Sequence, residues 1–167
     1  MKKNFYWLLL AMFGVIVLVS CSDDDDDIRV SDVPTAVLDA FEAKFPNVFR
    51  PEWENKQGYY VADFWQEGIE TQVWMSNLAE WKMTEYDLGT QLSLLPNAVQ
   101  SAFQASEYAA WRVDDLEKYV RTDMTFYQLE IETSGQADRD LFFREDGTLL
   151  KDAVDKDNDE VTPGTVF

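Results

Sequence analysis

The chain has 167 residues, with 14 lysines and arginines against 32 aspartates and glutamates, and its formal net charge is −18. It contains no histidine and a single cysteine. The missing imidazole excludes Ser-His-Asp and Cys-His catalysis, and a single cysteine excludes an intrachain disulfide and a Cys/His zinc site. The negative charge argues against nucleic acid as a partner, because neutralising phosphates needs lysine and arginine. We therefore expect a non-enzymatic protein with no cofactor and no metal.

The N-terminal residues have the pattern of an export signal. Lys2 and Lys3 are followed by an unbroken run of apolar residues and one glycine from Phe5 to Val19. A membrane-spanning helix needs about 20 such residues, so this shorter run indicates a signal peptide instead. The residues that close it, Leu18-Val19-Ser20-Cys21, resemble the lipobox of bacterial lipoproteins. That resemblance implies a signal peptide over residues 1–20, cleavage before Cys21 and lipid attachment to its thiol.

The segment after the cysteine is acidic. Asp23 to Asp27 are adjacent carboxylates that repel one another, so residues 21–32 are predicted to form a solvated tether. An acidic run in this place also resembles the surface-export signal of some Gram-negative lipoproteins. This resemblance implies an outer-membrane lipoprotein on the cell surface, with the periplasmic face as the alternative. An ordinary secretory signal that happens to end at Cys21 is a further alternative.

The rest of the chain shows internal similarity. Val33 to Val37 recurs as Leu95 to Val99, and Tyr59-Tyr60 recurs as Phe126-Tyr127. Self-similarity over such distances predicts a repeated structural unit. We expect a first unit over residues 33–90, a second over residues 91–153, and an acidic tail over residues 154–167.

Each unit begins with a predicted helix. Pro34 and Pro96 suit a first helical turn, apolar residues from Val37 to Phe45 form one stripe, and Pro46 ends the first helix. The apolar period then changes to two, which is typical of strands. Strands are predicted over Pro51–Lys56, Tyr59–Trp65, Thr71–Met75, Glu80–Tyr86, Trp111–Leu116, Phe126–Glu132, Arg139–Arg144 and Thr148–Lys151. The predicted fold class is α+β, with two tandem repeats of one helix and about four antiparallel strands.

The order of these motifs resembles a known family. A helix opening Leu/Val-Pro-x-Ala-Val, a strand carrying Tyr-x-(Ala/Leu)-x-(Phe/Ile), a glycine, another strand and the Asp146-Gly147 turn are similar to the PepSY-like family, described as β-lactamase-inhibitor-like. The resemblance covers Val33 to Asp152, and the first unit departs from it at its last turn, Ser76-Asn77-Leu78. It implies two helix-plus-sheet units in tandem that present a concave sheet face, and it carries no catalytic signature.

The candidate binding residues lie on the sheet face that we expect the helices to leave open. Large aromatic side chains that face water among acids resemble the core of a protein interface. In the third strand of each unit the assignment follows the repeat, which points Trp74 and Phe143 towards the helix; a slip of one residue would reverse it. Alternatively, two sheets pack these faces together or the tail covers them. The candidates are Tyr59, Trp65, Val73, Met75, Phe126 and Phe142.

The sequence therefore predicts a lipid-anchored envelope protein that binds a protein or peptide partner, with inhibition of a secreted enzyme as one version. The alternatives are a glycan- or calcium-binding surface module and a passive envelope component. Asp155 to Asp159 resembles the first half of a calcium loop, but Glu160 replaces the required glycine and Val166 the bidentate glutamate, so a frayed tail is predicted. With so many acids, a carboxylate pair for glycoside hydrolysis also stays open.

Overall fold

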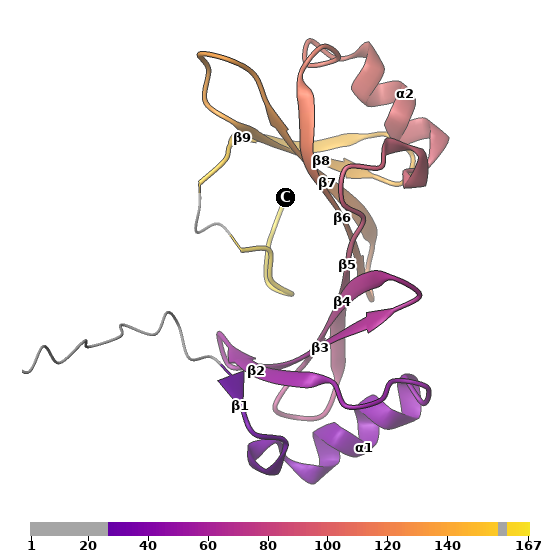
Figure 1. The fold of residues 1–167 in the computed structure, drawn as a ribbon, viewed down its shortest axis with the longest axis vertical. Helices are drawn as coiled ribbons and strands as arrows, with labels where there is room; N and C mark the ends of the chain where they lie inside the picture. Colours follow the sequence, from indigo (N-terminus) through magenta and orange to yellow (C-terminus); the bar gives the residue numbers. More distant parts are fainter. Residues whose placement is uncertain (1–26, 157–159) are drawn as a thin grey trace, which may run out of the picture.

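The computed structural model describes residues 27–156 and 160–167. Within them, one antiparallel sheet of nine strands carries the fold, and its strands are neighbours in the order in which they occur in the chain (Figure 1). The strands are β1 (Asp27–Ile28), β2 (Glu52–Lys56), β3 (Tyr59–Gln66), β4 (Ile69–Met75), β5 (Trp81–Asp87), β6 (Arg112–Arg121), β7 (Thr125–Glu132), β8 (Arg139–Arg144) and β9 (Leu149–Val154). The helices are α1 (Thr35–Lys44) and α2 (Asn97–Ala105), with short 3-10 turns at Val30–Asp32 and Leu92–Leu94. The predicted signal peptide, Cys21 and most of the tether lie outside the described residues.

The predicted pair of tandem helix-plus-sheet repeats is wrong, because the strands of both halves form one continuous sheet. β5 pairs with β6 from Met83 opposite Arg121 to Asp87 opposite Glu117. The strand predicted to end at Leu116 continues to Arg121, and the added residues are those that pair with β5. Because the predicted strand ended at Leu116, the residues that pair with β5 were not assigned to a strand. The two halves were therefore predicted as separate sheets.

The local elements otherwise follow from the sequence. Each helix begins one residue after its proline, whose fixed φ suits a helix start and whose missing N–H needs no partner there. The amide of Phe45 donates to the Phe41 carbonyl at 2.8 Å, and α1 ends before Pro46. The two-residue strand β1, which pairs with β2, was not predicted.

Residues with positive φ close the tight turns between strands. Gln57-Gly58 and Glu67-Gly68 join their strands as two-residue loops in which both φ angles are positive, as the type I′ turn requires. Gly147, between β8 and β9, carries a second constraint. A Cβ there would lie 2.6 Å from the Ala98 carbonyl oxygen, so glycine allows this turn to approach α2.

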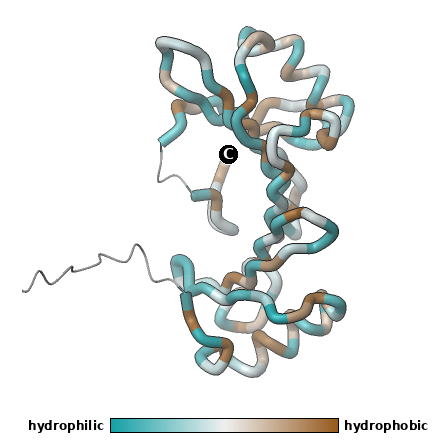
Figure 2. The backbone as a smooth tube through the Cα atoms, viewed as in Figure 1, coloured by the Kyte–Doolittle hydropathy of each residue, from teal (hydrophilic) through white to brown (hydrophobic). Residues whose placement is uncertain are grey.

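Both helices lie on the same side of the sheet, and each covers one half of that face (Figure 1). Under α1 the buried cluster includes Val37, Phe41, Trp53, Ala62, Phe64, Val73 and Met75. Under α2 it includes Val99, Phe103, Leu116, Tyr127, Leu129, Ile131, Leu141 and Phe143. Figure 2 shows hydrophilic and hydrophobic residues alternating along the strands, because successive side chains point to opposite faces.

The other side of the sheet, called here the concave face, is the side towards which both ends of the sheet bend (Figure 1). It carries a third buried cluster, the concave cluster: Val61, Trp74, Met83, Tyr119, Phe126, Phe142 and Val161. Val161 belongs to the segment 160–167, which lies against this face (Figure 1). The prediction of a frayed tail is therefore wrong for this segment, and the alternative that the tail covers this face is right for it.

Candidate functional site

A series of side-chain hydrogen bonds crosses the concave face from β5 to β8. The carboxyl groups of Glu85 and Glu117 hydrogen-bond to each other. The Tyr119 hydroxyl donates to Glu117 and lies 3.2 Å from Oε1 of Gln128. The Gln128 amide donates to Asp140 Oδ1 at 2.8 Å. These five residues, called here the polar network, fix polar groups of four neighbouring strands in the floor of the face.

The ionisation of the network follows from its burial. Burial, together with the charge of neighbouring carboxylates, raises the pKa of Glu85 to about 9 and that of Glu117 to about 7. Near neutral pH Glu85 is therefore protonated and donates to Glu117. Burial also raises the pKa of Tyr119, so its hydroxyl stays a donor. On β7, burial raises the pKa of Glu130 to about 7.

The six predicted binding residues occupy three different environments. Val73 and Met75 are buried beneath α1. Phe126 and Phe142 do lie on the concave face, but they are buried in the concave cluster. The expected exposure is therefore wrong for these four residues. On the same face Tyr59 is half-buried, with its ring 5.9 Å from that of Trp74, and the side chain of Trp65 is 68% exposed.

Strand register explains the wrong assignment in β4. Ala62, which faces α1, lies opposite Val73, so Val73 also faces α1 and Trp74 faces the concave side. The matching assignment in β8 is right, because Phe143 packs beneath α2 and Phe142 on the concave face. The alignment of similar segments was therefore one residue out of register in one strand only.

A pocket of about 510 Å³ lies beside Trp65 at the end of β3. The exposed ring of Phe49, from the loop between α1 and β2, lines it together with Trp65. Glu52, Asp63 and Glu70 add three carboxylates, and burial raises the pKa of the last two. Aromatic rings beside carboxylates suit a cationic side chain. We call this the Trp65 pocket.

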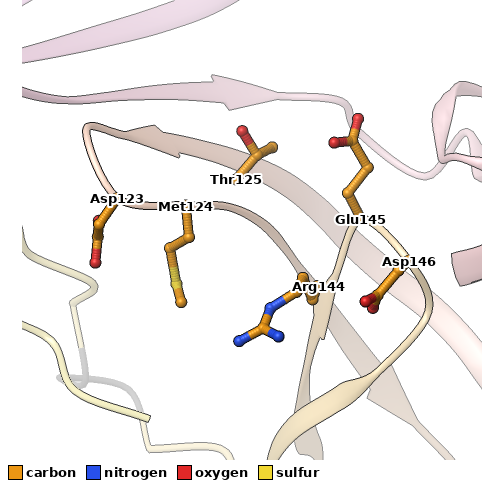
Figure 3. A pocket seen from close by; sticks show the side chains of 6 residues that line it. All are labelled: Asp123, Met124, Thr125, Arg144, Glu145 and Asp146. Carbon is orange, nitrogen blue, oxygen red and sulfur yellow. The ribbon is translucent and has the colours of Figure 1, made fainter.

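A second hollow, of about 420 Å³, lies between the β6–β7 turn and the β8–β9 turn. Figure 3 shows the side chains of Met124 and Arg144 extending to the same side of the strands, while Thr125 and Glu145 point the other way. Met124 also packs against the concave cluster, so this hollow adjoins the cluster. Asp123 and Asp146 complete its lining.

Sequence reasoning missed the polar network and the Trp65 pocket. Alternation did place Gln128 and Glu130 on the same face as Phe126, and polar residues among aromatics on one strand face were the available signal. The partners of Gln128 could not be found in this way, because Tyr119 and Asp140 lie on neighbouring strands of unknown register.

Among residues 27–156 and 160–167, no helix is long and apolar enough to cross a membrane. Within the same ranges, no group of three or more cysteine, aspartate or glutamate side chains is arranged to hold a metal ion.

A curved antiparallel sheet with both helices on one side, and an aromatic and acidic surface on the other, is a β-lactamase-inhibitor-like fold. The chain belongs to the PepSY-like family, since the family model described as "Putative beta-lactamase-inhibitor-like, PepSY-like" matches residues 58–151. The description of this family compares it with β-lactamase inhibitors. No curated protein is similar enough to this chain to count as a match.

Solved structures from Bacteroides support this assignment. A BLIP-like protein from Bacteroides fragilis NCTC 9343 is 36% identical, with 77% of this chain and 92% of that chain covered and a TM-score of 0.68. A DUF2874 family protein from Bacteroides uniformis ATCC 8492 is 27% identical, with coverage of 72% and 88% and a TM-score of 0.68. A structure from Bacteroides eggerthii DSM 20697, described as "putative periplasmic proteins", is 28% identical over 72% and 88%, with a TM-score of 0.68.

Proposed function

We propose that this chain is a lipid-anchored, non-enzymatic envelope protein whose concave face binds a protein or peptide partner in the manner of an inhibitor. The observation that carries the proposal is Trp65, whose large ring is 68% exposed next to a pocket. Exposed aromatic rings at pockets are typical anchors of protein interfaces. The family supports this function, because its description is β-lactamase-inhibitor-like and the Bacteroides fragilis structure is described as BLIP-like.

The Trp65 pocket favours a partner with a basic side chain. Three carboxylates and the exposed rings of Phe49 and Trp65 line it. Arg50 lines it too, with its guanidinium 5.0 Å from the Phe49 ring centroid, so the Trp65 ring is the aromatic face left for a partner. A lysine or arginine entering there gains both ion pairing and contact with an aromatic face. The formal net charge of −18 speeds the approach of a basic partner and slows that of an acidic one.

Attachment to the membrane belongs to the same proposal. The lipobox at Cys21 supports lipidation of its thiol and of the new N-terminus. Each buried CH₂ contributes about 0.8 kcal/mol and stable anchoring takes more than one acyl chain, so multiple acylation would hold the protein at the outer membrane. The relative described as periplasmic supports a place in the envelope, on its periplasmic face or at the cell surface.

Replacing Trp65 with alanine is expected to weaken partner binding by at least about 10-fold, because truncating an interface anchor costs about 2 kcal/mol or more. The measurement is capture from an envelope extract, followed by titration with the recovered protein. Leu78→Ala is the control, since Leu78 is also an exposed apolar residue but lies in the β4–β5 turn, outside the pocket. Equal binding by the Trp65→Ala variant and the wild type would refute the proposal that Trp65 anchors the partner.

The same extract distinguishes the alternatives. If capture recovers no protein while an oligosaccharide or Ca²⁺ raises the melting temperature, a glycan- or calcium-binding module replaces our proposal, because a ligand that binds only the folded state stabilises it.

Replacing Cys21 with alanine is expected to move the protein from the membrane fraction to the soluble fraction, because the thiol that accepts the lipid is lost. Fractionation followed by immunoblotting measures this shift. Ser22→Ala, next to the cysteine, is the matched control and should stay with the membrane. An unchanged distribution of the Cys21→Ala variant would refute lipid anchoring without affecting the proposed binding face.

A further inference from the structure

The apolar part of the concave face is occupied by the chain itself. The ring centroid of Phe167 lies 4.8 Å from that of Phe126 and 5.1 Å from that of Phe142. Val161 is buried in the same cluster. The Arg121 guanidinium donates to the Thr165 carbonyl at 2.7 Å. The same guanidinium lies 3.5 Å from the Pro163 carbonyl oxygen. Two apolar side chains and two backbone carbonyls therefore fix the segment 160–167 on the sheet.

The segment also reaches the other half of the sheet. The Gln57 amide donates to the Glu160 carboxylate at 3.3 Å, and Lys56 Nζ lies 3.4 Å from the same carboxylate. Both residues belong to the end of β2 and its turn, whereas Phe167 contacts β7 and β8. The segment thus spans the concave face as a bound peptide would.

Its attachment resembles that of a ligand rather than that of a strand. Residues 160–167 form no strand, so no backbone ladder holds them to the sheet. They form their own turn instead, in which the Thr165 amide donates to the Thr162 carbonyl and the Thr162 amide to the Thr165 hydroxyl. The ion pair of Lys56 with the exposed Glu160 adds little to this attachment, because water screens it. A segment held by so few contacts opens more readily than the sheet.

We propose that the concave cluster is a peptide-docking groove and that residues 160–167 are its resident ligand. It accepts in exchange a partner segment with an aromatic side chain for the Phe126–Phe142 site and a main-chain carbonyl for Arg121. The hollow beside Met124 adjoins this groove and offers a partner room beyond the resident segment. This inference rests on the proposed function and adds the chemistry of the partner.

The resident segment reduces the apparent affinity for any competitor. If the site is vacant for only a fraction of the time, the apparent Kd for an external peptide is the intrinsic Kd divided by that fraction. Loosening the resident segment must therefore strengthen the binding of a peptide supplied from outside. This consequence is testable without knowing the natural partner.

The test uses the full chain and a fluorescent synthetic peptide with the sequence of residues 160–167, followed by anisotropy. Phe167→Ala is expected to bind the peptide at least about 10-fold more tightly than the wild type, because the resident ring no longer competes. Val166→Ala is the matched control, since Val166 is 87% exposed in the same segment, and it should behave as the wild type. A peptide with its phenylalanine replaced by alanine should not bind.

A second variant and a second measurement cover the remaining cases. Val161→Ala combined with Phe167→Ala removes both buried anchors if one substitution leaves the segment in place. In the wild type, amide hydrogen exchange should be at least about 10-fold faster in residues 160–167 than in β7 and β8. Folded variants that do not bind the peptide, or equal exchange rates, would overturn the inference. Either result leaves the Trp65 experiment standing, because that experiment tests a different pocket.

Discussion

Replacing Phe126 with alanine is expected to lower the free energy of unfolding by about 3–5 kcal/mol, which is the usual cost of deleting a fully buried aromatic ring. The Phe126 side chain is 0% exposed. Its ring stacks on Tyr119 with centroids 4.9 Å apart and meets Phe167 edge-on. The cavity left by the substitution opens beneath the segment 160–167, so the loss includes part of the attachment of that segment.

Urea unfolding with a linear extrapolation measures this loss. Trp65→Ala is the control, since both residues were expected on the same open face and Trp65 is exposed there. A surface substitution changes stability by about 0.5 kcal/mol or less. Equal losses for the two variants would contradict the burial of Phe126 and would return it to the set of accessible binding residues.

Replacing Glu85 with glutamine is expected to stabilise the protein by about 1–3 kcal/mol near pH 8.5. This range is the usual free-energy cost of one buried polar group that is not properly satisfied. Burial raises the pKa of Glu85 to about 9, so between pH 5 and 9 the folded state holds a proton that the unfolded state has released. The unfolded state then binds fewer protons, and stability falls as pH rises. Glutamine stays neutral and keeps a donor for Glu117.

The measurement compares urea unfolding at pH 5.5 and pH 8.5. The wild type should lose stability across this range, and Glu85→Gln should lose less. Part of the slope should persist in the variant, because the raised pKa values of Glu117 and Glu130, both about 7, act in the same direction. Glu42→Gln, on the exposed side of α1, is the control and should follow the wild type. A variant with the full wild-type slope would show that Glu85 is ionised in the folded protein.

The local pattern of the sequence predicted most elements because local rules decide them. The stretch from Tyr59 alternates so that Tyr60, Ala62 and Phe64 face a helix, and the structure confirms this face. The prolines marked both helix starts within one residue. In these places the local periodicity and the backbone restrictions of proline determine the secondary structure, so no knowledge of tertiary contacts was needed to predict it.

The continuity of the sheet could not be predicted because it depends on residues whose partners lie far away. Positions 117–121 read Glu-Lys-Tyr-Val-Arg, which gives no drier face on either side. Glu117 and Tyr119 are nevertheless buried on the concave face, because residues of neighbouring strands in the polar network provide hydrogen-bond partners for their polar groups. That the tail covers this face was only an alternative for a similar reason, because Val161 and Phe167 are separated by residues typical of loops, so the sequence did not show which residues of the tail would dock.

The serial order of the strands has a consequence for how the chain acquires its structure. Every strand from β2 to β9 pairs with the strand that precedes it, so each one finds its partner already made as the chain emerges. Pairing between near neighbours closes short loops at small entropic cost and favours rapid folding. Residues 160–167 are the exception, because their contacts reach back to Lys56 and Gln57. We therefore expect folding to end with the docking of residues 160–167. The last folding intermediate is then a complete sheet on which this segment has not yet docked.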